Sequence, residues 1–295
     1  MPALSERALA KVNLTLAVLG RRADGYHELE SLVAFADCAD TLTLTASDSL
    51  TLDVTGPRAA ECGDLGDNLV LKAARALGET IPGLTMGAFT LDKHLPAAAG
   101  IGGGSADAAA ALRLLARANH LSLDDPRLAA AARATGADVP VCLLSSACVM
   151  EGAGEDISPV ALPKFPAVLV NPGVPVATRD VFAALRLKPG EKTWRGRDYV
   201  PMDVDLPSTA DSIPEWLLAI KAGGNDLETP ATWIQPVIND VLAALLRSDG
   251  RRLVRMSGSG ATCFGLFVDA AAAQAAVREI RAKEPRWWVE ATTLS

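Results

Sequence analysis

Residues 91–115 read LDKHLPAAAGIGGGSADAAAALRLL. The segment before Pro96 alternates as the end of a strand does, and the alanine- and leucine-rich stretch after Ser105 predicts a helix. Between them, glycine occupies positions 100, 102, 103 and 104. The order of strand, glycine loop and helix N-terminus decides how we expect this part of the chain to fold.

A loop of this composition favours anion binding. Glycine has no Cβ, so consecutive backbone N–H groups can turn inward and approach a ligand. The following helix adds unpaired N–H groups and the positive end of its dipole, which suit a phosphate. Ser105 or Asp107 could instead cap the helix, with the glycines forming only a tight turn. Four glycines within five positions exceed the need of one turn, so we favour phosphate binding.

The loop does not match the commoner nucleotide-binding templates. A P-loop requires G-x-x-x-x-G-K-[ST], and no lysine or threonine follows these glycines. The dinucleotide fingerprint G-x-G-x-x-G would need its third glycine at position 105, where serine stands.

Composition restricts the class of protein. The 295 residues are 49% apolar and 21% charged, which is typical of a soluble globular chain long enough for two modest domains. The net charge of −7 argues against a nucleic-acid partner, whereas backbone amides can bind a local phosphate without net charge. We therefore expect a small-molecule substrate. We also expect a monomer or homodimer, between which the sequence does not decide.

Cysteine usage and hydropathy indicate a compartment. The five cysteines are scattered, without a C-x-x-C motif or a histidine pair at metal spacing, so we expect reduced thiols and no metal site. No signal peptide or apolar run of membrane-spanning length is visible. These features predict a cytoplasmic protein with no membrane partner.

The remaining elements are predicted from periodicity and from Gly, Pro and capping signals. We expect strands at Ala8–Leu19, within Leu32–Leu52 as a hairpin or meander, after Asp138, at 167–172, on either side of the 257–261 turn, and at 287–294. We expect helices at 68–77, 123–135, 178–185, 214–222, 231–247 and 270–283. Residues 188–214 are rich in proline, charge and tryptophan, which predicts a surface loop or insertion.

The glycine loop also resembles a known motif. Residues 96–112, PAAAGIGGGSADAAAAL, resemble the P-x-x-x-G-[LI]-[GS]-[GS]-[GS]-[SA]-[SA] loop of the GHMP kinases, which include galactokinase, homoserine kinase and mevalonate kinase. In that family the loop wraps the phosphates of ATP without a Walker lysine. The resemblance implies ATP binding by Pro96, Ala97, Ala98, Ala99, Gly100, Ile101, Gly102, Gly103, Gly104, Ser105 and Ala106. Alanine at 106, where many relatives have serine, puts a second hydroxyl contact in doubt but leaves the backbone cradle intact.

Two further motifs point to the same family. AKVNL at 10–14 followed by GRRADGYH at 20–27 resembles the opening of its diphosphocytidyl-methylerythritol kinase branch. MSGSGATCF at 256–264 resembles the family's third motif, a second glycine loop beside the phosphates, although a tight hairpin without a ligand would have the same pattern.

Lys11 and Asp138 are the predicted catalytic residues. Lys11 lies two residues from Asn13 on a predicted strand, where a lone lysine more often faces solvent. Asp138 lies in G-A-D-V-P, where an isolated aspartate would usually cap a helix or form a turn. The resemblance implies that Asp138 is the catalytic base, and Lys11 can favour its ionised form and offset developing negative charge.

The remaining site predictions concern the two substrates. Tyr26 and Phe182 offer aromatic faces to a cytosine, and His27 can exchange hydrogen bonds with it, although Phe182 could equally be a core residue. Asn13 would contact the methylerythritol or its diphosphate. Thr178, the expected N-cap of its helix, is the last residue predicted to bind the phosphoryl-acceptor substrate. Asn68 and Lys93 are predicted to bind ATP. Asn68 could equally be only a helix cap.

The resemblance implies an α+β fold with two domains. An N-terminal domain like that of ribosomal protein S5 would span 1–157, a ferredoxin-like domain would span 158–295, and the active site would lie in the cleft between them. The implied activity is ATP-dependent phosphorylation of the 2-hydroxyl of the methylerythritol unit of CDP-methylerythritol, in the non-mevalonate route to isoprenoid precursors. Mg²⁺ would arrive with the nucleotide. Another GHMP kinase of the homoserine or mevalonate type, or a catalytically silent nucleotide-binding protein, are the alternatives.

Overall fold

The chain forms two compact units, each assembled from separate stretches of sequence. The computed structural model describes residues 3–197, 206–207 and 212–295. Unit 1 comprises Met1–Lys11, Cys38–Ala97 and Gly102–Ser145. Unit 2 comprises Val12–Asp37, Ala98–Ile101 and Ser146–Ser295. Strands β1 (Leu4–Asn13) and β3 (His27–Thr45) each run from one unit into the other.

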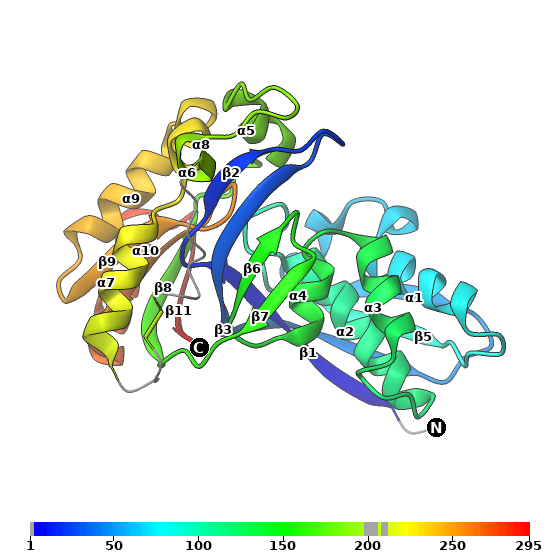
Figure 1. Cartoon of the computed structure of the whole chain (residues 1–295). Coiled ribbons are helices and arrows are strands. Elements are labelled where there is room, and N and C mark those ends of the chain that lie inside the picture. The colour runs from blue at the N-terminus through cyan, green and yellow to red at the C-terminus, as the bar shows by residue number, and fades with distance from the viewer. Residues whose placement is uncertain (1–2, 198–205, 208–211) are drawn as a thin grey trace. The chain divides into compact units, whose positions relative to one another are not determined.

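Unit 1 packs helices against a short sheet (Figure 1). Its sheet contains β1 as far as Lys11, which pairs with β3, the later part of β3, which pairs antiparallel with β5, and β4, which pairs parallel with β5. Its remaining elements are β4 (Thr51–Thr55), η1 (Ala59–Cys62), η2 (Leu65–Asp67), α1 (Leu69–Thr80), β5 (Ala88–Asp92), α2 (Gly103–Ala118), α3 (Pro126–Thr135) and α4 (Val139–Leu144).

Helix α2 is the central helix of unit 1. It contacts α1, α3 and α4, and alanines 108–111 on it are fully buried. Small side chains on several faces let neighbouring helices approach closely, which explains why the alanine-rich sequence forms a buried helix. The glycine loop leads directly into α2, so the packing of this helix holds the C-terminal end of the loop in place.

Unit 2 contains an antiparallel sheet of ferredoxin-like order. Its strands follow the order β11-β8-β10-β9, and α9 and α10 pack on that sheet and on each other. The predicted ferredoxin-like C-terminal half is therefore confirmed. The remaining elements of unit 2 are β2 (Ala17–Arg21), β6 (Cys148–Gly152), β7 (Asp156–Pro159), β8 (Phe165–Asn171), α5 (Thr178–Ala184), α6 (Trp194–Arg197), α7 (Ile213–Gly223), α8 (Glu228–Ile234), α9 (Val237–Arg247), β9 (Arg251–Met256), β10 (Cys263–Phe267), α10 (Ala270–Lys283) and β11 (Trp288–Leu294).

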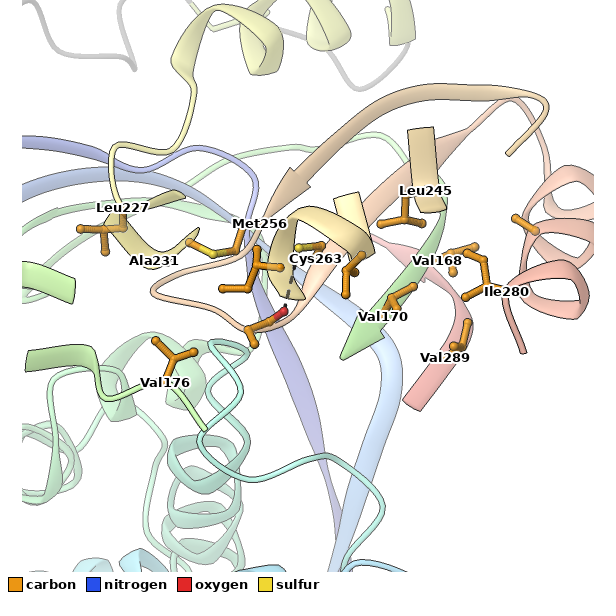
Figure 2. Close-up of a cluster of buried hydrophobic side chains, with 14 of the residues drawn as sticks. Val168, Val170, Val176, Leu227, Ala231, Leu245, Met256, Cys263, Ile280 and Val289 are labelled. Carbon is orange, nitrogen blue, oxygen red and sulfur yellow. Dashed lines mark hydrogen bonds between the residues drawn. The ribbon is translucent and has the colours of Figure 1, made fainter. Parts of the chain in front are cut away.

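A cluster of buried apolar side chains joins this sheet to its helices. Figure 2 shows Val168 and Val170 of β8 with Leu245 of α9, Ile280 of α10 and Val289 of β11. All five side chains are less than 3% exposed, so the cluster excludes water from this sheet face.

Several sequence-based expectations are corrected by the structure. Residues 139–144 form helix α4 rather than a strand, and Ala8–Leu19 divides into β1 and β2. The region 32–52 belongs mostly to one long strand, β3, instead of a hairpin, and Pro236 separates two helices where one was expected. A proline can end an element that a continuous apolar pattern predicts to continue, because it removes a backbone N–H and fixes φ.

Three further expectations concern the 188–214 region, the cysteines and membrane-spanning segments. The predicted loop or insertion at 188–214 contains α6, but residues 198–205 and 208–211 of it lie outside the described residues. No disulfide joins any of the five cysteines, all of which are described. Within the described ranges, no helix is both long enough and apolar enough to cross a membrane.

Leu245→Ala should lower the free energy of unfolding by about 2–4 kcal/mol, because it leaves a cavity in the cluster of Figure 2. Leu246→Ala is the matched control, since Leu246 is 52% exposed and should lose less than about 1 kcal/mol. Urea unfolding measures both, and equal losses would contradict the assigned core.

Candidate active site

The glycine loop leads straight into the amide end of α2. Gly102 occupies the N-cap position in the left-handed conformation, with φ of 63°. The first intrahelical bond runs from Ala106 N–H to Gly102 O at 2.8 Å, so the amides of Gly103, Gly104 and Ser105 precede it. No side chain caps the helix, so the alternative in which Ser105 or Asp107 does so was wrong. Amides at a helix N-terminus suit an anion, so phosphate binding here stays a prediction.

The middle of the loop packs against a second glycine loop within unit 2. A Cβ on Gly100 would lie 2.5 Å from Ser257 O and 2.7 Å from Gly260 O, and Gly100 has φ of 74°. Ser257 Oγ donates to Gly100 O at 2.9 Å, and Thr262 N–H donates to Ala99 O at 3.1 Å. The third motif therefore fixes the shape of the first.

Asn13 joins the same network. Its backbone N–H donates to Ser257 Oγ at 3.0 Å, and its Nδ2 donates to Ser31 Oγ at 2.7 Å. The side chain is 1% exposed, and Oδ1 has no hydrogen-bond partner among the described residues. A buried acceptor without a donor is costly, so Asn13 suits a ligand hydroxyl or amine.

Lys11 and Asp138 form an ion pair in unit 1. Lys11 Nζ lies 3.0 Å from Asp138 Oδ1, and the side chains are 5% and 38% exposed. Asp138 occupies the N-cap position of α4 without capping it, so its carboxylate is available for other contacts. Lys11 therefore does not face solvent, and Asp138 is not the side-chain cap that a lone aspartate would suggest.

Gly102 of the glycine loop lies against Lys11 of this pair. A Cβ on Gly102 would lie 3.3 Å from Lys11 Cβ and 3.4 Å from Lys11 Cε. The lysine, the aspartate and the first amides of α2 thus belong to one local site within unit 1. A carboxylate that can accept a proton and an ammonium beside a phosphate-binding loop are the groups that phosphoryl transfer requires.

A cavity of about 600 Å³ in unit 2 is lined by four of the five residues predicted to bind the acceptor substrate, and Asn13 is not among its lining residues. Its lining includes Tyr26, His27, Thr178 and Phe182. The His27 and Phe182 rings stack with centroids 4.4 Å apart and planes 25° apart. Phe182 is half-buried and also packs against the core cluster, so it takes part in both environments.

Local contacts position these side chains. Arg21 Nε donates to Gly25 O at 3.2 Å, and its Nη1 donates to Leu187 O at 3.1 Å. These bonds hold the turn that carries Tyr26 and His27. Burial lowers the pKa of His27, and the nearby Arg21 guanidinium adds to this. His27 therefore favours the neutral imidazole, which can both donate and accept hydrogen bonds.

Three predicted site residues have other contacts in the structure. Asn68 caps α1, its Oδ1 accepting from Val70 N–H at 2.9 Å. Thr178 begins α5 without capping it, and its Oγ1 lies 2.9 Å from Ser259 Oγ. Lys93 is 2% exposed, so the structure does not bring its ammonium to the surface.

Two regions of the chain match descriptions of one protein family. The family description "GHMP kinases N terminal domain" matches residues 68–146, and "GHMP kinases C terminal" matches residues 214–286. A protein of Rhodopseudomonas palustris named 4-diphosphocytidyl-2-C-methyl-D-erythritol kinase is 62% identical over 292 residues, which cover 99% of this chain and 97% of that protein. The chain belongs to the GHMP kinase family.

Solved structures agree with this assignment. A crystal structure of 4-(cytidine 5'-diphospho)-2C-methyl-D-erythritol kinase is 35% identical, with a TM-score of 0.76 and 99% of each chain covered. A homoserine kinase from Cytophaga hutchinsonii, 18% identical with a TM-score of 0.71 over 100% of this chain and 95% of that one, shares the fold. This GHMP kinase is therefore a small-molecule kinase of α+β fold, and the family uses ATP. The predicted domain boundary between residues 157 and 158 lies between the two matched regions and remains a prediction.

Sequence reasoning missed several residues of the site. Ser257 bridges Gly100 and Asn13, Ser259 contacts Thr178, and Asp40 contacts Lys93. The serines lie inside the third motif, which was interpreted through its glycines alone. Asp40 stands in the otherwise alternating run ADTLTLT, and a charge entering such a run was the available signal.

Gly104→Ala should separate phosphate binding from turn formation. A Cβ there would meet only Leu69 Cδ1 at 3.5 Å, so the melting temperature should hold or rise slightly as helix propensity improves. If the amides approach a phosphate closely, affinity for ATP should nonetheless fall about tenfold or more, as measured by calorimetric titration.

Gly100→Ala is the comparison for that experiment, because its added Cβ overlaps two carbonyl oxygens. This variant should lose several degrees of melting temperature. A Gly104→Ala variant with unchanged ATP affinity would contradict a close phosphate cradle at this position.

Proposed function

We propose that this chain phosphorylates the 2-hydroxyl of 4-diphosphocytidyl-2-C-methyl-D-erythritol with ATP, in isoprenoid precursor synthesis by the non-mevalonate pathway. The observation that carries the proposal is the Lys11–Asp138 pair beside a glycine loop, in a chain 62% identical to a kinase of that name. ATP and free thiols fit a cytoplasmic enzyme.

The residues of unit 1 supply the phosphoryl-transfer step. The acceptor hydroxyl attacks the γ-phosphorus, a new O–P bond forms, and the bond to the β–γ bridging oxygen breaks, releasing ADP. Asp138 takes the hydroxyl proton, and the Lys11 ammonium holds Asp138 and offsets charge on the transferring group. The amides of Gly103, Gly104 and Ser105 hold the phosphates, with the Ser105 hydroxyl as a further donor.

Magnesium fits this arrangement as part of the nucleotide complex. Mg²⁺ retains several waters and binds phosphate oxygens with one or two carboxylates at most. Asp138, 38% exposed beside the glycine loop, is the carboxylate of the site that would contact such an ion. When bound, it would neutralise charge on the β- and γ-phosphates.

The unit 2 cavity supplies recognition of the cytidine end. Tyr26 is 63% exposed and can close over a base, while Phe182 provides a second aromatic face. Neutral His27 can pair with the polar edge of cytosine. Asn13 Oδ1 is buried and has no hydrogen-bond partner among the described residues. In the proposed complex it accepts a hydrogen bond from the cytidylated substrate.

Asp138→Asn should reduce kcat about 10³-fold, because the amide cannot take the hydroxyl proton, while ATP affinity changes little. ADP release would be measured with 4-diphosphocytidyl-2-C-methyl-D-erythritol beside homoserine, mevalonate and galactose. Asp156→Asn, on an exposed part of β7, is the matched control and should retain full activity.

Each result of that panel has a definite meaning. Turnover by the wild type only with the cytidylated acceptor, lost in Asp138→Asn, supports both substrate and base. Turnover on another acceptor keeps the kinase and discards the substrate. ATP binding without turnover on any of the four acceptors would favour the catalytically silent alternative.

Tyr26→Ala should raise KM for the cytidylated acceptor about tenfold, since removing a stacking ring from a base costs about 1–3 kcal/mol. KM for ATP and the melting temperature should hold, because the ring is exposed. Trp233→Ala removes another exposed ring, 71% accessible, from α8 and is the control. A similar change in KM in both variants would refute stacking on Tyr26.

A further inference from the structure

A buried charge cluster lies beneath the glycine loop in unit 1. Lys93 Nζ is 2.5 Å from Asp40 Oδ2 and 2.6 Å from Asp107 Oδ2. The three residues are 2%, 0% and 3% exposed, respectively. Buried ions of this kind are expensive unless they are paired and hydrogen-bonded.

The cluster connects the two ends of the phosphate loop. Asp40, on β3, accepts through Oδ1 from the backbone N–H groups of His94 at 2.6 Å and Leu95 at 2.8 Å, where the loop begins. Asp107 lies near the start of α2, where the loop ends. A Cβ on Gly103 would be 3.4 Å from Lys93 Nζ, so the ammonium lies against the first turn of α2. Lys93 is therefore placed to act on the nucleotide through the loop.

The charges in the cluster do not balance. With every group ionised, two carboxylates and one ammonium leave one negative charge next to amides that bind an anion. Asp107 Oδ1 is buried and has no hydrogen-bond partner within the described ranges. Burial raises the pKa of Asp107 to about 7, with Lys93 opposing and the Asp40 carboxylate adding to the rise. A proton on Asp107 would remove the imbalance.

The surrounding groups leave Asp107 as the site for this proton. Besides Lys93 and Asp40, the thiols of Cys62 on η1 and Cys142 on α4 lie near Asp107, and Glu61, Lys11, Asp138 and Arg113 are charged groups near those thiols. Burial raises the pKa of the Cys62 thiol, and burial raises the pKa of the Cys142 thiol to about 12, so both stay neutral near pH 7. Helices α1 and α3 present buried apolar residues to α2.

We propose that Asp107 takes up a proton from solvent when the phosphates of the nucleotide bind the glycine loop, and that Lys93 is a positioning residue that transmits this charge change to the loop. The proton adds to the carboxylate, and no other bond changes. A negative ligand nearby favours the neutral acid, and by reciprocity the neutral acid favours the ligand. The inference rests on nucleotide binding in the proposed function and is independent of the acceptor.

The direct test is proton uptake on nucleotide binding. MgADP would be titrated calorimetrically into the wild type at pH 7.5, in buffers of different ionisation enthalpy. A one-unit rise in the pKa of Asp107 on binding corresponds to about half a proton taken up per nucleotide. Asp107→Asn, which cannot titrate, is the matched control for protonation of the nucleotide itself. Equal uptake by the two proteins would overturn the proposal.

Affinity supplies a second readout. From pH 6.5 to pH 8.5, the affinity of the wild type for MgADP should fall by more than that of Asp107→Asn. The extra loss should be up to about tenfold, because a one-unit pKa shift sets that limit. Parallel pH profiles would contradict the coupling. If nucleotide fails to bind at all, the proposed function fails as well, whereas binding and acceptor turnover without differential uptake would refute only this inference.

The pH dependence of folding stability without nucleotide tests whether the Asp107 carboxyl holds the proton. The pKa of Asp107 is about 7 when folded and near 3.8 when unfolded, so the folded state holds the extra proton and stability falls as pH rises from about 4 to 7. The melting temperature of Asp107→Asn relative to wild type should therefore increase over that range and level off above pH 7. A constant difference across the range would show that Asp107 does not hold the proton, which would also overturn the proposal.

Discussion

The candidate site depends on a main-chain contact that has no room for a side chain. Gly100 lies so close to the carbonyl groups of Ser257 and Gly260 that a single added carbon would overlap both. This approach lets one buried hydroxyl, that of Ser257, bind Gly100 O and the Asn13 amide at once. Three segments remote in sequence are thereby held in register around the phosphate loop. Backbone geometry, more than side-chain chemistry, shapes this part of the enzyme.

Much of the fold was predictable because local signals agreed with tertiary structure. Helix α10 spans the residues expected from its alanine-rich sequence, and Asn68 caps α1 as its side chain predicts. The errors share a cause. Residues 139–144 are apolar and carry Pro140, a pattern that suits a buried strand or a short buried helix equally well. Only packing against α2 and α3 decides between the two.

The candidate site was predictable to the extent that its chemistry lies in contiguous motifs. Lys11 Nζ and Asp138 Oδ1 lie 3.0 Å apart, although the two residues are 127 positions apart in the sequence. No rule of sequence spacing predicts that contact, so its prediction depended on the family resemblance. The role of Lys93 was different, because its partners Asp40 and Asp107 come from a strand and a helix on either side of it. Sequence identifies a lysine beside a glycine loop, but its burial follows from tertiary packing alone.

The interleaving of the two units has a consequence for synthesis on the ribosome. Every stretch of unit 1 lies within the first 145 residues, whereas residues 12–37 and 98–101 of unit 2 must wait for partners after residue 145. Unit 1 can therefore complete its core while half of the polypeptide is still unmade. During that interval β2 can pair with β3, but the buried side chain of Val18 lacks the core partners that residues after 145 supply. This nascent intermediate is the species that a chaperone would protect.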